Sequence, residues 1–451
     1  MKTKRKEDAD IIVVGGGASG LMAAGRAAQC GARVLLLEKT SAIGKKILVS
    51  GKTRCNLTNS NDLNNFIDMY GPNGLFLHSV FHRFFRFELL TFFERYNLKT
   101  KTEQGGRIFP VTDDARDIVR VFQKYLLNFG VRIMLRSPVE FVERKDRSIF
   151  RVKTAEREYA SQCVILATGG SSWPETGSSG DGFKLAAKMG HSIVKLRPAL
   201  VPLIVYEQKL AASMQGVSLR NVRATAFAGK AEDIDTKLIS DISYGRGQKK
   251  KPKAPLIESR FGEMIFTHFG LGGPIILLMS LGVVDALQKG PVSVLIDLKP
   301  AVTKQQLGRR LQKDFDTHGK KKIISVMKDY LPSKMIEPVI DLTGIDREKL
   351  AHQITAYERQ KIVETLKALR FNIKESLPLK NAIITAGGVA LDEIDPRTMA
   401  SKIVPGLFFC GEVMDIDADT GGYNLQAAFS TGYVAGESAA EQVMLPHEKM
   451  P

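Results

Sequence analysis

Residues 9–38 read ADIIVVGGGASGLMAAGRAAQCGARVLLLE, and this stretch decides the fold. Its β-branched apolar run at 11–14 is typical of a strand buried on both faces of a parallel sheet. The glycine-rich turn 15–20 follows without a gap, and then come a predicted helix over 21–30 and a second apolar strand that ends at Glu38. Strand, glycine turn, helix, strand and acid within about thirty residues predict a Rossmann-like dinucleotide-binding unit.

The positions of this unit have separate chemical roles. Gly15 permits the tight turn out of the strand, Gly17 lets a diphosphate approach the backbone, and Gly20 lets the helix pack against the sheet. The start of the helix offers free N–H groups and partial positive charge to the phosphates. Glu38 is placed to accept hydrogen bonds from ribose hydroxyls, and its charge disfavours the 2′-phosphate of NADP.

The segments beyond this unit favour FAD over NAD. A long polar loop over 41–59 follows Glu38, where an NAD dehydrogenase usually continues with further strand–helix units, and such a loop suits the longer FAD molecule. An apolar strand over 163–170 ends in small residues, and a strand over 406–412 precedes a glycine pair and an alanine-rich helix. The N-terminus of that helix would face the N1–C2=O edge of a flavin and stabilise negative charge there.

These motifs together resemble the bacterial BaiN-like and aminoacetone-oxidase-like flavoproteins. The resemblance is carried by GGGASG at 15–20, SGKTRCNLTN at 50–59, ATGGSSWPETGSSGDG at 167–182, FTHFGLGGP at 266–274 and FFCGEVMDIDADTGGYNLQAA at 408–428. It runs from the N-terminus to about residue 440, although between about 210 and 370 it includes only the FTHFGLGGP segment. Thr53 and Gly272 stand where family members often have glycine and serine, so the substrate need not be the same.

The resemblance implies FAD contacts from the phosphate loop to the last helix. The implied positions are Gly15, Gly17, Gly20, Glu38, Lys39, Lys46, Ser50, Gly51, Asn56, Thr168, Gly169, Gly411, Glu412, Asp415, Gly422, Asn424, Leu425 and Gln426. Ala18 and Ser19 of the phosphate loop and Val139 complete the predicted cofactor site, and no metal site is predicted.

The pattern changes twice along the rest of the chain. Short alternating strands predict a β-barrel-like substrate domain at 198–302. Residues 303–372 turn helical and basic, and 373–451 return to the domain that begins with 1–197. The predicted fold is therefore an α/β, two-dinucleotide-binding-type FAD domain, discontinuous, with inserted β-barrel-like and helical subdomains.

Composition favours a globular protein with a basic surface. The 451 residues carry a net charge of +17, which suits either a solvated surface or a polyanionic partner such as nucleic acid, and the lysine run at 248–253 leaves the same alternatives open. Four dispersed cysteines indicate neither a zinc site nor a redox pair and favour a reducing compartment. No signal-peptide pattern or apolar run of about 20 residues occurs, so we expect a cytoplasmic protein without a membrane span.

The candidates for contact with the flavin ring and the substrate are Asn56, Tyr423, Asn424 and His268. His268 opens a second glycine-rich helix start over 268–274, which either faces a substrate carbonyl or carboxylate or forms a tight interdomain turn. Cys55 lies in the loop expected near the flavin, where the pattern fits both a packed thiol and a reactive one.

These features predict an FAD-dependent oxidoreductase that transfers a hydride between flavin N5 and a small organic substrate. The family resemblance allows enone reduction or amine oxidation, with NAD(P)H as a transient reductant or O₂ as the acceptor. Two alternatives stay open, namely a flavoprotein that acts on or binds RNA, and a flavin-binding redox sensor without turnover. The physiological substrate and the oligomeric state, monomer or dimer, do not follow from the sequence.

Overall fold

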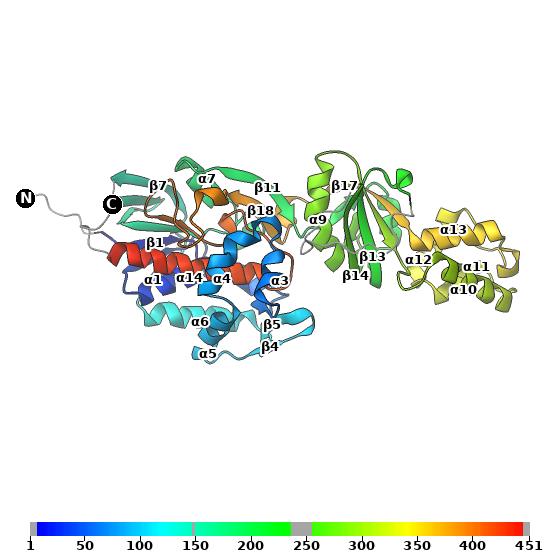
Figure 1. Ribbon diagram of the computed structural model, residues 1–451, viewed down its shortest axis with the longest axis horizontal. Helices are drawn as coiled ribbons and strands as arrows, with labels where there is room; N and C mark the ends of the chain where they lie inside the picture. Colours follow the sequence, from blue (N-terminus) through cyan, green and yellow to red (C-terminus); the bar gives the residue numbers. More distant parts are fainter. Residues whose placement is uncertain (1–6, 147–148, 236–254, 445–451) are drawn as a thin grey trace, which may run out of the picture. The chain divides into compact units, whose positions relative to one another are not determined.

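The computed structural model describes residues 7–146, 149–235 and 255–444 and divides the chain into two compact units (Figure 1). The first unit runs from Met1 to Arg197 and resumes at Ile383, and the second is the insertion between them. The sequence pattern placed the return at residue 373. It comes later because β17 (Leu369–Ser376) pairs with two strands of the inserted unit. The lysine run at 248–253 lies outside the described residues.

Five parallel strands form the central sheet of the first unit. In spatial order they are β19 (Leu407–Phe409), β10 (Cys163–Leu166), β1 (Ile11–Val14), β2 (Val34–Leu37) and β6 (Arg132–Met134). All residues of the four strands other than β6 are buried, as their unbroken apolar runs predict. The predicted Rossmann-like FAD-domain fold is confirmed.

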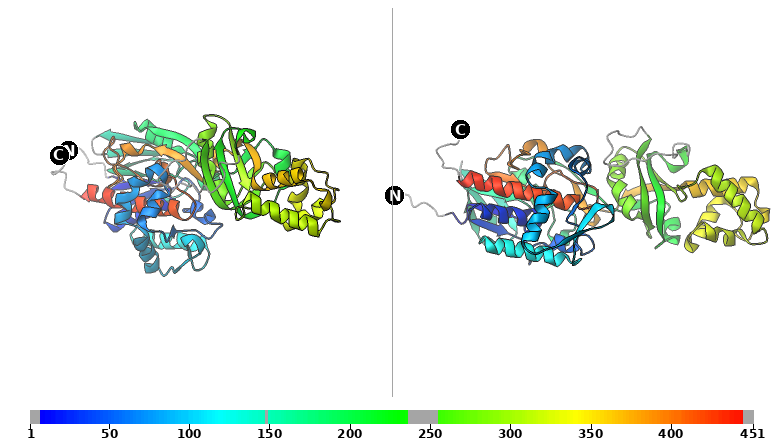
Figure 2. Two further views of the ribbon diagram at one scale, coloured as in Figure 1. Left: turned by 45° about the vertical axis from the view of Figure 1, so that its right-hand side comes forward. Right: turned by 60° about the horizontal axis from the view of Figure 1, so that its bottom comes forward.

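Three helices of this unit lie side by side, namely α1 (Ala18–Gln29), α6 (Ala115–Asn128) and α14 (Tyr423–Met444) (Figure 2). Helices α1 and α14 run parallel with their backbones in contact. A Cβ atom at Gly432 would lie 2.3 Å from the carbonyl oxygen of Ser19, and one at Gly436 would lie 2.3 Å from that of Ala23. Because Gly432 stands beside the start of α1, the preceding two turns of α14 extend past the phosphate loop.

Smaller elements complete the first unit. The helices are α2 (Lys45–Val49), α3 (Leu63–Asp68), α4 (His78–Arg83), α5 (Arg86–Arg95) and α7 (Asp181–Lys188). The strands form three small sheets, of β3 (Thr58–Asn59), β4 (Thr100–Thr102) and β5 (Arg107–Pro110), of β7 (Val139–Asp146), β8 (Ile149–Thr154) and β9 (Glu158–Ser161), and of β11 (Ile193–Ala199) with β18 (Ile384–Val389).

The inserted unit contains a closed six-stranded barrel. Around the barrel the order is β12 (Leu203–Val205), β15 (Gly270–Gly272), β14 (Leu256–Phe266), β13 (Ser218–Ala228), β16 (Val292–Asp297) and β17. The sequence predicts a glycine-rich helix start before Pro274, either facing a substrate group or forming an interdomain turn, and no strand there. Its residues 270–272 form strand β15, which pairs with β12 and β14. Pro274 begins helix α9 (Pro274–Leu287), as predicted.

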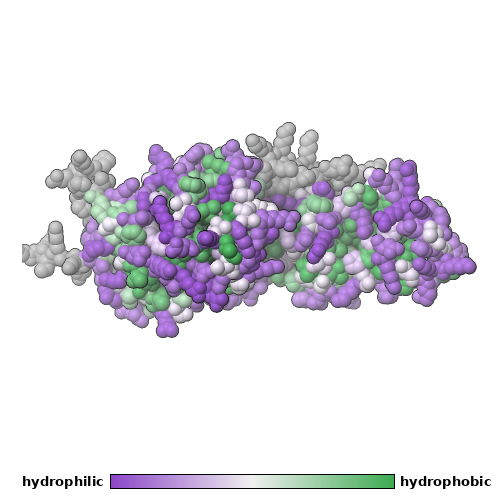
Figure 3. Space-filling view, turned by 90° about the horizontal axis from the view of Figure 1, so that it is seen from below, coloured by the Kyte–Doolittle hydropathy of each residue, from purple (hydrophilic) through white to green (hydrophobic). Residues whose placement is uncertain are grey.

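A group of helices shares one hydrophobic core with the barrel. Its members are α8 (Gln208–Ser213), α10 (Lys304–Thr317), α11 (Ile323–Val326), α12 (Ser333–Thr343) and α13 (Ala356–Lys367). The helical segment predicted at 303–372 therefore packs with the barrel as one compact unit. The face of the molecule drawn in Figure 3 is mainly hydrophilic, with scattered hydrophobic side chains. Within the described residues, no helix has the length and apolar character needed to cross a bilayer.

Candidate cofactor site

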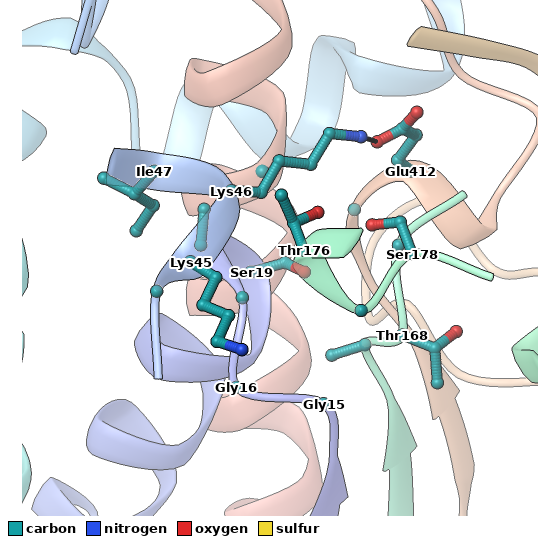
Figure 4. A pocket seen from close by; sticks show the side chains of 18 of the residues that line it. Gly15, Gly16, Ser19, Lys45, Lys46, Ile47, Thr168, Thr176, Ser178 and Glu412 are labelled. Atoms are coloured by element: carbon teal, nitrogen blue, oxygen red, sulfur yellow. Dashed lines mark hydrogen bonds and ion pairs between the residues drawn. The ribbon is translucent and has the colours of Figure 1, made fainter. Parts of the chain in front are cut away.

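A pocket opens at the carboxyl ends of β1, β2 and β10, between the start of α1 and the first turns of α14 (Figure 4). Most of the predicted cofactor-binding residues line it, from both ends of the chain. They are Gly15, Gly17, Ala18, Ser19, Glu38, Lys39, Lys46, Ser50, Val139, Thr168, Gly169, Gly411, Glu412, Asn424 and Leu425. Such a crevice beyond the strand ends is where open α/β sheets bind their ligands.

Glu38 holds the glycine loop 15–20 at one end of this pocket, which we call its phosphate end because the sequence predicts the diphosphate there. Its carboxylate accepts hydrogen bonds from the backbone N–H groups of Gly16 and Thr40, each at 2.7 Å, and the side chain is buried. A Cβ atom at Gly17 would meet nothing within 4 Å, whereas one at Gly20 would lie 1.9 Å from the carbonyl oxygen of Gly15. Gly17 therefore leaves room in front of the helix, and Gly20 serves the packing of helix against strand and does not line the pocket.

Lys39 connects the end of β2 to the start of α7. Its ammonium group lies 2.6 Å from a carboxylate oxygen of Asp181 and also donates to the hydroxyl of Ser179. Burial alone would raise the pKa of Asp181, but the bonds from Lys39 and Ser179 hold it below its ordinary value. The carboxylate is therefore ionised at neutral pH and fixes the lysine beside the pocket.

A second ion pair, between Lys46 and Glu412, crosses the pocket wall (Figure 4). The Nζ atom of Lys46 lies 2.6 Å from Oε2 of Glu412 and 2.9 Å from the hydroxyl of Ser172. The other carboxylate oxygen of Glu412 accepts from the N–H of Thr385 at 2.8 Å. Four chain segments that are far apart in sequence are thus joined at one point beside the predicted cofactor.

The loop that follows α2 has an unusual backbone. Gly51, Lys52, Thr53 and Cys55 all have φ between 56° and 67°, in the left-handed region. Three of these four carry a side chain, and a β-branched threonine is disfavoured there most strongly. Family members often have glycine at the position of Thr53, and the observed φ gives the physical reason.

Arg54 of this loop bonds to acidic residues outside it and so holds the loop in place. Its guanidinium group bonds to Asp113 at 2.6 and 2.8 Å, pairs with Glu103, and lies 4.2 Å from the ring centre of Phe109. The side chain of Cys55 is fully buried, and burial raises the pKa of its thiol to about 12. Cys55 is therefore a packed neutral thiol at physiological pH.

Three buried acceptor atoms near the pocket have no hydrogen-bond partner among the described residues. They are Oδ1 of Asn56, Oγ1 of Thr168 and Oε1 of Gln426, all at predicted cofactor positions. Buried polar atoms nearly always have a hydrogen-bond partner, so three such atoms without one indicate that a ligand or water binds there. The ring N3–H, the ribityl hydroxyls and the adenine amino group of FAD are donors that such acceptors can bind, so these residues fit the cofactor.

The candidates for ring and substrate contact are distributed over both units. Asn424 lines the pocket, but its side chain bonds both to the N–H and to the carbonyl of Ala418 and so shapes the preceding loop. The hydroxyl of Tyr423 accepts from Asn61 at 2.8 Å. His268 is exposed and belongs to the inserted unit, whereas the pocket belongs to the first unit.

The other predicted positions flank the pocket. A Cβ atom at Gly422 would lie 2.4 Å from the carbonyl oxygen of Thr58, so the glycine pair lets α14 approach β3. Asp415 stands between Met414 and Ile416, which line the pocket, and burial together with Asp417 raises its pKa. Gly51 is exposed and does not line the pocket.

Sequence reasoning missed several lining residues. Thr431 lies one turn beyond Ala427 and Ala428 on the same face of α14, so helical spacing from Asn424 was a usable signal. The segment 176–178 also lines the pocket, but it comes from an irregular loop that offers no periodic pattern. Among the described residues, no group of three or more His, Cys, Asp or Glu side chains could hold a metal ion.

Comparison with known proteins agrees with this geometry. Residues 9–438 match the family described as the HI0933-like protein Rossmann domain. The chain is 31% identical to a 3-dehydro-bile acid Δ(4,6)-reductase of Clostridium scindens, over 96% of this chain and 99% of the relative. It is 29% identical to a ribosomal RNA dihydrouridine synthase of Escherichia coli, over 95% of this chain and 97% of the relative.

A solved structure is also similar, a 3-ketosteroid-Δ4-(5α)-dehydrogenase of Rhodococcus jostii RHA1. It is 15% identical, its alignment covers 98% of this chain and 99% of that chain, and the TM-score is 0.44. The family match and the 31% identical relative each span nearly the whole sequence. The chain therefore belongs to the HI0933-like family, the FAD-dependent oxidoreductases that its sequence motifs resemble.

Proposed function

We propose that this chain binds FAD in the Rossmann pocket and reduces a carbon–carbon double bond conjugated with a carbonyl group. The observation that carries the proposal is one continuous pocket, from the phosphate loop to the first turns of α14, beside buried acceptor atoms without partners. The names of two relatives support the reaction class, because a Δ(4,6)-reductase of a 3-keto steroid and a dihydrouridine synthase both saturate such a bond.

In this proposal the chain holds FAD by its whole length. The space at Gly17 and the N-terminus of α1 receive the diphosphate, and Glu38 receives the ribose. The N-terminus of α14 stabilises negative charge at the ring edge. Bound FAD, once reduced, would supply hydride from N5. The net reaction takes a hydride, that is two electrons and one proton, from a donor such as NAD(P)H, and a second proton from solvent.

Residues at the ring end then position the substrate. Asn56, Tyr423 and Asn424 remain the proposed ring-facing group, and His268 the proposed contact from the inserted unit. The hydroxyl of Tyr423 accepts from Asn61, so its own hydrogen is free to be donated to a substrate carbonyl. Such donation draws electrons from the double bond and so favours hydride attack at its β-carbon.

Anaerobic photometry of the purified yellow protein tests the proposal. NADH and NADPH are added separately, and then a cyclic enone, a 4-en-3-one steroid and a panel of small amines. We expect a nicotinamide to bleach the flavin bands and an enone to restore them, with the saturated ketone found by mass spectrometry. Bleaching by an amine alone would instead establish amine oxidation and refute the proposed direction. A protein that no donor bleaches would be a flavin-binding redox sensor.

A second candidate has the same chemistry on a different carrier, namely reduction of the uracil C5=C6 bond in RNA. The net charge of +17 favours it, since RNA binding draws on cationic side chains. The name of the E. coli relative also favours it. With NAD(P)H present, loss of uridine and gain of 2 mass units in digested RNA would support this substrate, and turnover of free enones alone would exclude it.

A further inference from the structure

The positive charge of this protein is concentrated in the inserted unit. Residues 198–382 contain 30 Lys and Arg against 19 Asp and Glu, a net charge of +11. The first unit is longer but has 35 Lys and Arg against 29 Asp and Glu, a net charge of +6. The chemistry of the pocket requires no such excess in the insertion, so the excess calls for a separate explanation.

Part of this charge forms a basic ridge, which we define as Arg309, Lys313, Lys320 and Lys321. Arg309 and Lys313 stand four residues apart on α10 and so share one face of the helix, and the two lysines follow in the turn after it. All four residues are exposed. Among the described residues, none of the four cationic groups bonds to an anionic side chain, so the ridge presents its charge to solvent.

The carboxylates nearest in sequence do not neutralise the ridge. Asp314 accepts from the hydroxyl of Tyr330 and lies 4.0 Å from Arg310. Asp316 accepts from Gln312 at 2.7 Å and is the one exposed acid on α10. Lys322, next to the ridge, pairs with Glu348 and is not counted in it. The two acids of α10 therefore leave the charge of the ridge unpaired.

We propose that the basic ridge binds the phosphate backbone of RNA. This inference rests on the second candidate function, since it supplies the surface that an RNA substrate needs. Cationic side chains on one face of a helix are the usual electrostatic footprint of nucleic-acid binding. A membrane surface would also require an exposed apolar face, and no large hydrophobic side chain between residues 304 and 330 is exposed. The helical end of the inserted unit is mainly hydrophilic in the view of Figure 3, with some hydrophobic side chains among the hydrophilic ones.

The test compares two charge-reversal variants of the full-length, FAD-loaded protein. The ridge variant is R309E/K313E/K320E/K321E. The control variant is R95E/K99E/K124E/R132E, whose four residues are equally exposed but belong to the first unit. Both variants change the net charge by the same amount. The probe is a fluorescein-labelled single-stranded oligouridylate, measured by anisotropy across a salt series.

We expect the ridge variant to bind the oligouridylate at least tenfold more weakly than wild type near 100 mM salt. Each lost phosphate contact removes about 0.7 from the slope of log Kd against log salt, so the slope should fall by about 3. The control variant should stay within about threefold of wild type. A neutral variant, R309Q/K313Q/K320Q/K321Q, should show most of the loss and guards against misfolding of the glutamate form.

Three outcomes would overturn the proposal: no RNA binding by wild type, equal losses in the ridge and control variants, or a ridge variant that loses binding only to phosphatidylglycerol vesicles. The last would assign the ridge to a lipid surface. Reduction of a free enone is measured on the same samples. If it persists in the ridge variant while RNA binding is lost, the pocket and the ridge have separate roles, so the inference stands or fails apart from the flavin chemistry.

Discussion

The two ends of the cofactor pocket are built on different principles. At the phosphate end, the carboxylate of Glu38 is already bonded to backbone N–H groups of the loop that it holds. At the ring end, a run of left-handed residues around Thr53 precedes Asn56, whose buried carbonyl oxygen has no partner among the described residues. The loop at the first end is held by bonds within the protein, and the second end keeps a buried acceptor that a ligand can bond.

Two glycines of the phosphate loop offer the sharpest test of this contrast. Gly20→Ala should abolish folding of the first unit, because the new Cβ atom would overlap a carbonyl oxygen at 1.9 Å. Gly17→Ala should fold normally, since its φ of −82° suits alanine and its Cβ atom meets nothing, but it should be purified colourless because the Cβ atom blocks the diphosphate. Circular dichroism and flavin content check both. A yellow Gly17→Ala protein would refute the placement of the diphosphate.

At the ring end, Cys55 should be about 1000-fold less reactive than an ordinary thiol at pH 8. Burial raises its pKa to about 12 from 9.0, so the thiolate fraction is about 1000-fold smaller. Its alkylation by iodoacetamide should therefore quicken about tenfold for each unit of pH between 8 and 11. Mass spectrometry follows the reaction, with the partly exposed Cys30 as internal reference. Rapid labelling of Cys55 at pH 7 would show that this loop opens freely.

Removing the carboxylate of Glu38 should weaken FAD binding less than Gly17→Ala does. Glu38→Ala leaves two N–H groups of the loop unpaired and removes the ribose acceptor. A lost hydrogen bond to a charged group is worth about 1.5–3 kcal/mol, so we expect FAD binding to weaken by about 10- to 100-fold. Glu38→Gln keeps one acceptor and should fall between this variant and wild type. Fluorescence titration of the apoprotein measures the affinities. Undiminished FAD content in Glu38→Ala would rule out the ribose assignment.

The smallest effect concerns Thr53. Thr53→Gly removes a β-branched side chain from a φ of +67° and should stabilise the first unit by about 1 kcal/mol, or about 2 °C in Tm. Thr100→Gly, in strand β4, is the matched control and should lower Tm, because glycine weakens a strand. A Thr53→Gly protein that melts below wild type would mean that the threonine side chain contributes bonding that outweighs its strain.

The two ends also differ in how far sequence predicts them. Ile11 to Glu38 could be assigned because each local pattern has one structural meaning, a strand, a turn, a helix and a terminal acid. At the ring end, the sequence predicts which residues belong to the site but not their backbone conformation or bonding. The left-handed run at 51–55 is held by Arg54, which bonds to Glu103 and Asp113, 49 and 59 residues away. The bond of Asn424 to Ala418 spans six residues but lies in a segment without regular secondary structure, so no periodic pattern encodes it.

The same limit explains the inserted unit. Alternating short strands predict the barrel, but they do not predict the strand Gly270–Gly272, because three residues with two glycines carry almost no strand signal. Their pairing with β12 and β14 is decided by barrel closure. The first unit resumes only at Ile383 for the same reason, because β17 pairs with strands of the inserted unit that precede it by more than 70 residues.

The parallel contact of α14 with α1 has a consequence for biosynthesis. The helix that forms one wall of the pocket begins at Tyr423, so it leaves the ribosome long after its partner α1, which ends at Gln29. Until the insertion and α14 have been synthesised, the first unit lacks one wall of the pocket, so we expect it not to bind FAD. A chain truncated before residue 423 would therefore lack one wall of the proposed FAD pocket.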